Sequence, residues 1–247
     1  MKNMIVGIIP ARYASSRFPG KPLIDIKGKS MIQRVYEQAI KSKLLHKVVV
    51  ATDDERIFNH VVNFGGQAVM TATHHPSGTD RCWDALQQLE EEYQYVINIQ
   101  GDEPLIEPAQ IDELAAILQD GETTLATQMM VIDNYETLFD KGEVKIVLNV
   151  NKEALYFSRM VIPFIKEIDE KEWHLHHHYF RHVGMYAYRK DVLKKITQLP
   201  VSSLEIAESL EQLRWLENGI SIKCIITKYE SHCIDTAEDL EKLLHLF

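Results

Sequence analysis

The sequence predicts an α/β protein built on a mostly parallel, doubly wound sheet. Short β-branched runs alternate with longer amphipathic segments through the first half of the chain, which is typical of strand, helix, strand crossovers. The runs at 4–9 and 95–100 are nearly continuous apolar stretches, as expected for strands covered on both faces. The composition is that of a globular protein, with 45% hydrophobic and 26% charged residues.

The first half is expected to hold five strands and four helices. Strands are predicted at 4–9, 47–52, 67–71, 95–100 and 124–131. Helices are predicted at 30–43, 54–64, 79–93 and 108–119, with starts at Asp53, at Ser77 or Thr79, and at Glu107 or Pro108. Ligands of such sheets bind beyond the carboxyl ends of the strands. We therefore expect residues 10–21, 72–79 and 100–104 to surround one crevice.

The second half is less regular. Strands are predicted at 144–149, 154–159, 182–189 and 221–227, and helices at 190–197, 204–218 and 236–246. The polar, aromatic stretch at 160–181 has little periodicity and is interpreted as an excursion near the site or a subunit contact. No repeat or Gly/Ser linker divides the chain, so one domain over 1–247 is expected.

Charge and cysteine content narrow the classes of function. The net charge is −9, from 27 basic and 36 acidic residues, which disfavours nucleic acid as the main partner. No apolar run approaches 18 residues, so no membrane partner is expected. The chain has an odd number of cysteines without CxxC spacing: Cys82, Cys224 and Cys233. This predicts reduced, partly buried thiols. The first residues read as a buried strand instead of a signal peptide, and a cytoplasmic location is expected.

The loop IPARYASSRFPGKPL at 9–23 carries three cations, Arg12, Arg17 and Lys21. It contains neither GxxxxGK[ST] nor GxGxxG, so neither a Walker A loop nor a dinucleotide site is indicated. Three cations at the ligand edge of a sheet would suit a polyphosphate, because guanidinium groups chelate phosphate oxygens and lysine adds a mobile charge. An ordinary solvated basic loop explains the spacing equally well.

Acidic residues follow two of the predicted strands. Asp102 and Glu103 come directly after the strand in NIQGDEP, where a carboxylate would bridge Mg²⁺ to a phosphate; a turn acid or helix cap is the alternative. Asp235 follows the last strand in CIDTAEDL. Taken alone it is interpreted as a helix cap, with a metal ligand as the alternative, whereas Glu238 and Asp239 are first-turn acids beside the helix dipole.

Three other stretches have an ordinary structural interpretation beside a functional one. In HHPSGTDR, the segment 77–79 would present N–H and hydroxyl groups to a base, although a helix cap is the commoner use. The five histidines of HLHHHYFRH lack the spacing and carboxylate of a zinc site, so solvated side chains are favoured. SLEIAESLEQLR is first of all an amphipathic helix, with Glu211 and Gln212 as candidates to point into a cleft.

Eight motifs, in order, resemble the 3-deoxy-D-manno-octulosonate (KDO) cytidylyltransferase family. They are IPARYASSRFPGKPL, VATDDERI, HPSGTDR, NIQGDEPLI, ALYFSRMVIPF, RHVGMYAYR, LEQLRWLENG and IDTAEDLEKL, and they extend from about residue 5 to 244. The resemblance implies a Rossmann-like sugar-nucleotidyltransferase fold with a smaller inserted part, roughly 150–220, for sugar binding and dimer contacts. It further implies a cytoplasmic, Mg²⁺-dependent homodimer that transfers CMP from CTP to KDO in lipopolysaccharide biosynthesis. One departure is Ala237, where the family often has proline.

The resemblance also assigns residues. Lys21, Asp102 and Asp235 would be catalytic, with the two aspartates holding Mg²⁺. The nucleotide site would comprise Pro10, Ala11, Arg12, Lys21, Ser77, Arg81 and Gln100. The sugar site would comprise Arg159, His182, Tyr186, Glu211 and Gln212. Arg17 stays undecided between phosphate and the sugar carboxylate.

Three rival functions are distinguishable by sequence or assay. A cytidylyltransferase for another acidic sugar, such as sialic acid or 8-amino-KDO, would share the motifs. A glycosyltransferase would usually show Asp-x-Asp after the fourth strand, where this chain has Asp102-Glu103-Pro104. A catalytically silent nucleotide-binding regulator would be expected to have lost a loop cation or an aspartate, and all are present.

Overall fold

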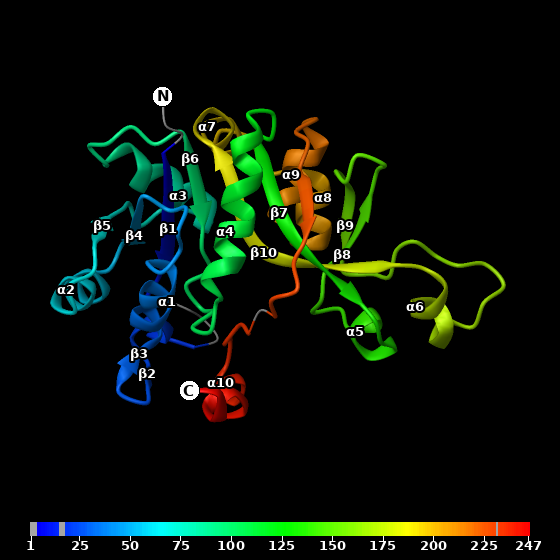
Figure 1. Ribbon diagram of the computed structural model, residues 1–247, viewed down its shortest axis with the longest axis horizontal. Coiled ribbons are helices and arrows are strands. Elements are labelled where there is room, and N and C mark those ends of the chain that lie inside the picture. Colours follow the sequence, from blue (N-terminus) through cyan, green and yellow to red (C-terminus); the bar gives the residue numbers. More distant parts are fainter. Residues whose placement is uncertain (1–3, 15–17, 231) are drawn as a thin grey trace.

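The computed structural model describes residues 4–14, 18–230 and 232–247. Within them a nine-stranded sheet has the main order β11-β7-β10-β6-β1-β4-β5 (Figure 1). The strands β1 (Ile5–Ala11), β4 (Lys47–Thr52), β5 (Ala68–Met70) and β6 (Tyr95–Asn98) are parallel. Further along, β7 (Leu125–Ile132) and β11 (Lys223–Ile226) are also parallel to each other, whereas β10 (Tyr179–Arg189) runs antiparallel between β6 and β7. The predicted mostly parallel α/β sheet is confirmed.

The helices of the first half cover both faces of this sheet. They are α1 (Met31–Ala39), α2 (Glu55–Asn63), α3 (Gly78–Gln87) and α4 (Pro108–Ile117). Ser77 caps α3 through its side chain, which accepts the N–H of Asp80. The start predicted at Asp53 is wrong by one residue, because it is Asp54 whose carboxylate accepts the N–H of Arg56 and caps α2. A 3-10 turn, Leu118–Asp120, extends α4.

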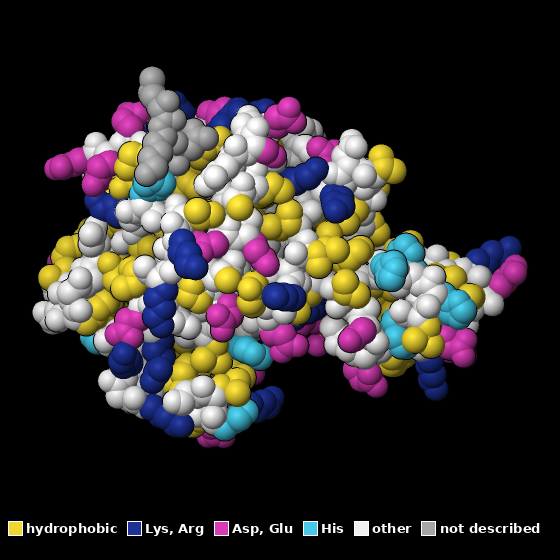
Figure 2. Space-filling model, in the orientation of Figure 1, with side chains coloured by type: hydrophobic (Ala, Val, Ile, Leu, Met, Phe, Trp, Pro, Cys, Tyr) yellow, Lys and Arg dark blue, Asp and Glu magenta, His cyan; other side chains and the backbone are white. Residues whose placement is uncertain are grey.

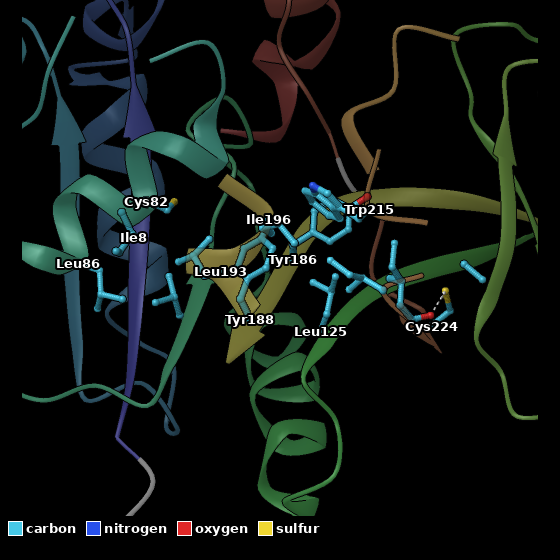
Figure 3. Close-up of a cluster of buried hydrophobic side chains, with 14 of the residues drawn as sticks. Ile8, Cys82, Leu86, Leu125, Tyr186, Tyr188, Leu193, Ile196, Trp215 and Cys224 are labelled. Atoms are coloured by element: carbon cyan, nitrogen blue, oxygen red, sulfur yellow. Dashed lines mark hydrogen bonds between the residues drawn. The ribbon is translucent and has the colours of Figure 1, made fainter. Parts of the chain in front are cut away.

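Two hydrophobic clusters fill the space between sheet and helices. Because successive strand residues point to opposite faces, Val6 and Ile8 of β1 enter one cluster and Ile5 and Ile9 the other. Figure 3 shows part of the first cluster, in which Tyr186 and Tyr188 of β10 lie close to Trp215. Each fully buried aliphatic side chain contributes about 1.5–3 kcal/mol relative to leaving it exposed.

A smaller part of the chain projects beyond the main sheet. The hairpin of β8 (Lys145–Leu148) and β9 (Ala154–Ser158) joins the sheet through β10. Beyond it, α5 (Tyr135–Phe139), a 3-10 turn at Glu170–Glu172 and α6 (Trp173–His176) form the projecting arm at the right of Figure 1. The strand predicted at 182–189 begins three residues earlier, at Tyr179, so the end of the 160–181 stretch belongs to the sheet.

The helix predicted over 204–218 is wrong as a single element. The structure has α7 (Lys190–Thr197) as expected, and then α8 (Ser203–Glu208) and α9 (Glu211–Glu217). The break falls at Ser209, which adopts the left-handed backbone with φ 54°, and at Leu210, which is extended and buried. The turn redirects the chain, so that Leu210 packs in the core and Glu211 faces α3.

The C-terminal segment returns to the sheet's ligand edge. The helix α10 (Ala237–Leu243) continues into a 3-10 turn, Leu244–Leu246, and packs on the short hairpin of β2 (Asp25–Ile26) and β3 (Lys29–Ser30). Just before it, the N–H of Ile234 donates to the carbonyl of Asp102 at 3.0 Å. This contact brings Asp235 beside the carboxyl end of β6. No helix among the described residues combines the length and apolar character needed to cross a bilayer.

Candidate active site

A cleft of about 310 Å³ lies at the carboxyl ends of β1 and β6. All three predicted segments contribute to it, which confirms the predicted crevice. It is lined by Pro10, Ala11, Arg12, Ala14, Lys21, Pro22, Gly78, Gln100, Gly101 and Asp102. Lys21 opens a 3-10 turn, Lys21–Leu23, directly after Gly20, whose φ of 73° is readily adopted by glycine.

The floor of the cleft requires a close approach of two backbones. A Cβ atom added at Gly101 would lie 2.8 Å from the carbonyl oxygen of Pro10, nearer than real Cβ contacts allow. One added at Gly78 would lie 3.2 Å from the ring of Pro10. The two glycines therefore let the β6 exit and the α3 start close around the end of β1.

Lys21 joins the two predicted metal ligands. Its Nζ donates to Asp102 Oδ2 at 2.7 Å and to Asp235 Oδ1 at 3.0 Å. Burial alone would lower the pKa of Lys21, but the neighbouring carboxylates of Asp102 and Asp235 raise it above its usual value. The amine is therefore charged at neutral pH, and it offsets the repulsion between the two aspartates.

The two open interpretations of Asp235 separate in the structure. The helix cap is Thr236, whose hydroxyl accepts the N–H of Asp239, while Asp239 accepts the N–H groups of Asp235 and Thr236 in return. The carboxylate of Asp235 is thus directed to Lys21 and Asp102 instead of capping α10.

Cys233 is a member of this group that sequence reasoning missed. Its Sγ lies within 4.8 Å of one carboxylate oxygen of each aspartate. It is exposed, whereas Cys82 and Cys224 are buried, in place of the partly buried thiols predicted for all three. The signal was its spacing: in an extended segment, residues two apart share a face, so Cys233 points the same way as Asp235.

The other cations of the opening loop have different surroundings. The guanidinium of Arg12, which lines the cleft, donates to the carbonyl of His75 at 2.5 Å, and the His75 ring lies 2.6 Å from a carboxylate oxygen of Asp84. This holds Arg12 toward the 72–79 segment. Arg17 lies outside the described residues.

Arg81 does not join the cleft. Its side chain is fully buried, where it lies 3.2 Å from the carboxylate of Asp53 and donates to Thr71 at 2.5 Å. Burial lowers its pKa, and the Asp53 carboxylate partly opposes that shift. Arg81 is therefore not among the residues that line the nucleotide cleft, and its contacts hold α3 against the end of β4.

A second cleft, of about 290 Å³, adjoins the first and shares Gln100 and Asp102 with it. Its other lining residues are Glu103, Gly142, Glu143, Arg181, His182, Val183, Gly184 and Cys233. Gln100 closes the boundary by donating to the carbonyl of Gly184 at 2.6 Å. Sequence reasoning missed Arg181, although it stands next to His182 in the quoted RHVGMYAYR motif.

Of the five predicted sugar residues, His182 lines this second cleft. Its Nε2 lies 2.9 Å from Thr127 Oγ1, and burial lowers its pKa to about 3, so the ring is neutral at pH 7. Tyr186 lies behind it in the core, with its ring against that of His182. Figure 3 shows Tyr186 close to Trp215. Arg159 is occupied with backbone carbonyls: it donates to Glu208 at 2.9 Å and to Lys141 at 3.2 Å.

Glu211, predicted for the sugar site, contacts the start of α3. Its carboxylate accepts from Thr79 Oγ1 at 2.9 Å and from Arg214 at 2.9 Å, and the Ser77 hydroxyl lies 2.9 Å from it. Burial raises its pKa, while the hydroxyls and Arg214 oppose that shift. A residue predicted for the sugar thus supports the 77–79 segment of the nucleotide cleft. Gln212, the next residue, is buried.

This α/β fold, with Lys21 and two carboxylates gathered at the ligand edge of its sheet, is that of a nucleotidyltransferase, and the comparisons agree. Residues 6–223 match a family model described as cytidylyltransferase. The 3-deoxy-manno-octulosonate cytidylyltransferases of Parabacteroides distasonis and Cytophaga hutchinsonii are 56% and 54% identical, over 97% and 98% of this chain and 96% of each relative. A solved CMP:2-keto-3-deoxy-manno-octonic acid synthetase complexed with CTP superposes with a TM-score of 0.91 at 43% identity, covering 98% of both chains.

The chain therefore belongs to the 3-deoxy-manno-octulosonate cytidylyltransferase family. The family resemblance drawn from the eight motifs is confirmed.

Proposed function

We propose that this chain transfers CMP from CTP to the anomeric 2-hydroxyl of KDO and releases pyrophosphate. The observation that carries the proposal is the pair of adjoining clefts that share Asp102 and Gln100. One cleft offers Arg12 and Lys21 to a triphosphate. The other offers His182 and Arg181, whose guanidinium also lies 3.5 Å from Glu143, to an acidic, hydroxyl-rich acceptor. The relatives' names, and the CTP complex of the solved neighbour, support this assignment of substrates.

The reaction is one in-line displacement. The sugar hydroxyl oxygen forms a bond to the α-phosphorus of CTP, the bond from that phosphorus to the bridging oxygen breaks, and the hydroxyl proton is lost to solvent. Both reactants are anions, so Lys21 and Arg12 would stabilise the charge that develops on the phosphate oxygens. The neutral His182 is a poor proton acceptor, so its role would be to orient the acceptor.

We also propose that Asp102 and Asp235 hold Mg²⁺. The donor set fits a hard cation, because carboxylate oxygens of Asp102 and Asp235, from separate segments, lie within 4.8 Å of each other. Asp102 also lines the cleft, where phosphate oxygens and water would complete the coordination. When bound, Mg²⁺ would neutralise phosphate charge and lower the pKa of the attacking hydroxyl.

One assay tests the activity. Pyrophosphate release is measured with each of the four nucleoside triphosphates, with and without KDO, in the presence of Mg²⁺. Release that requires both CTP and KDO is the expected result. Release with sialic acid and not with KDO would contradict the proposed acceptor. Use of a sugar nucleotide as donor would favour the glycosyltransferase, and no release under any condition would favour the silent regulator.

We further propose that the protein is a homodimer that works in the cytoplasm in lipopolysaccharide biosynthesis, as the family resemblance implies. Large apolar side chains of the projecting arm are exposed, with Phe164 at 72% and Leu175 at 71%. Figure 2 shows hydrophobic and histidine side chains gathered on this arm. Such a patch on a soluble enzyme favours a subunit contact.

A further inference from the structure

We propose that Lys21 is the resident counter-ion of the metal site, and that its amine leaves this place when a divalent cation enters with the nucleotide. The inference rests on the proposed function, because it takes Asp102 and Asp235 as the metal ligands. It assigns Lys21 a position before the reaction that is distinct from the triphosphate contact implied by the family.

The geometry places the lysine amine where a bridging cation belongs. Nζ lies 2.7 Å from Asp102 Oδ2 and 3.0 Å from Asp235 Oδ1, so one ammonium group bridges both carboxylates. The lysine side chain is only 14% exposed, compared with 24% and 34% for the two aspartates. The bridge also joins parts of the chain that lie far apart, since 81 and 214 residues separate Lys21 from its two partners.

A divalent cation and the ammonium group cannot share this position. Both carry positive charge, and both would be in direct contact with the same two carboxylates. The lysine stem is flexible, so the amine is able to move while its backbone stays in the Lys21–Leu23 turn. Lys21 also lines the nucleotide cleft, where a triphosphate would give the displaced amine a new anionic partner.

Two consequences follow for binding. Without nucleotide, a divalent cation must compete with Lys21 for Asp102 and Asp235, so its affinity is weak. With nucleotide, the triphosphate accepts the displaced amine, so metal and nucleotide bind cooperatively. The lysine would thereby keep the carboxylates assembled and the site closed to stray cations until the substrate arrives.

The test measures Mn²⁺ binding by electron paramagnetic resonance, with and without a non-hydrolysable CTP analogue. Lys21→Met keeps the length of the side chain and removes its charge. Without nucleotide we expect this variant to bind Mn²⁺ at least about tenfold more tightly than the wild type, within the usual range of coupling between sites. The analogue should tighten Mn²⁺ binding less in the variant than in the wild type.

Matched variants locate the effect. Lys29→Met removes another lysine that is paired with a carboxylate, Glu37, outside the cleft, and should leave Mn²⁺ binding unchanged. Lys21→Arg keeps a cation and should keep Mn²⁺ binding weak. Adding Asp102→Asn to Lys21→Met should abolish the tighter Mn²⁺ binding of the single variant. Thermal unfolding of every variant establishes that each is folded.

The outcomes separate this inference from the proposed function. Suppose that Asp102→Asn and Asp235→Asn both weaken Mn²⁺ binding in the presence of the analogue, but that Lys21→Met does not bind Mn²⁺ more tightly in its absence. The counter-ion role is then overturned and the metal site stands. If neither aspartate variant affects Mn²⁺ binding, the metal site itself is overturned, and the counter-ion role with it.

Discussion

The carboxylate of Glu211 accepts a hydrogen bond from the hydroxyl of Thr79 at 2.9 Å. Glu211 is the first residue of α9, and Thr79 lies in the first turn of α3, so the contact joins elements from opposite halves of the chain. Gly78, the residue beside Thr79, lines the nucleotide cleft. The shape of that cleft thus depends on a helix that the sequence associates with the sugar.

Replacing Glu211 should therefore affect nucleotide use. Glu211→Ala removes an acceptor that Ser77, Thr79 and Arg214 share, which should lower the free energy of unfolding by about 1–3 kcal/mol. The KM for CTP should rise as the 77–79 segment loosens. The KM and stability of Glu211→Gln should lie between those of the wild type and Glu211→Ala. Denaturant unfolding and initial rates measure both effects, with the exposed Glu241→Ala as control. A change in the KM for KDO alone would show that Glu211 acts only on the sugar.

Much of this arrangement is predictable from local sequence pattern. Continuous apolar runs locate the parallel strands, and the rule for strand ends brings Lys21, Gly78 and Asp102 to one crevice. The direction of β10 is not predictable in this way, because an apolar run does not encode whether it pairs parallel or antiparallel. The break at Ser209 is equally hidden, because the helical spacing of apolar residues continues through it and does not encode the left-handed backbone there.

Burial explains the residues whose position differs from expectation. The family resemblance assigns Arg81 to the nucleotide and Arg159 to the sugar, yet the first is enclosed beside Asp53 and the second is bonded to backbone carbonyls. The bridge from Lys21 to Asp235 spans almost the whole chain, so no local pattern contains it. In each case a local sequence pattern does not show which distant residue the side chain contacts.

Asp235→Asn should lower turnover by at least about 10²-fold, the scale associated with losing a positioned charge. The amide keeps the size of the side chain but removes the negative charge beside Lys21 and Asp102. Because Thr236 and not Asp235 caps α10, the fold should be retained, which circular dichroism checks. Glu238→Gln, an exposed acid in the first turn of the same helix, is the control for turnover at saturating Mg²⁺. Turnover near the wild-type value would rule out the proposed ligand.

Gly101→Ala should destabilise the protein by about 1–3 kcal/mol, as overpacking of a tight contact does. The added methyl group would meet the carbonyl oxygen of Pro10 at 2.8 Å, and backbone is able to shift less than a side chain. Gly184→Ala is the matched control for stability, because the nearest atoms there lie at 3.8 Å. Equal free energies of unfolding for the two variants would contradict the close approach of the β1 and β6 ends.

His182 should make stability sensitive to acid. Burial lowers the pKa of His182 to about 3 in the folded protein, whereas a histidine in the unfolded chain has a pKa of about 6.5. Between these values the unfolded state binds the extra proton, so stability is lost as pH falls, by at most about 1.4 kcal/mol per pH unit. His182→Asn should flatten this dependence in urea unfolding between pH 6 and 4, and exposed His245→Asn should not. Identical slopes for wild type and His182→Asn would contradict the burial argument.

Charges placed on the projecting arm should separate the proposed dimer. Phe164→Asp and Leu175→Asp each introduce a charge where an apolar side chain is more than two-thirds exposed. Leu175→Asp should leave the folded monomer intact, whereas Phe164→Asp also removes an edge-on contact with Trp173, so circular dichroism of both variants is the control for folding. In a subunit contact the same charge would be desolvated without a partner, which is costly. Sedimentation velocity should therefore show a dimer for the wild type and a monomer for the double variant. Ile40→Asp, at an apolar residue 53% exposed at the end of α1, is the control and should stay dimeric. A double variant that sediments like the wild type would place the subunit contact elsewhere on the surface, and a monomeric wild type would exclude the dimer.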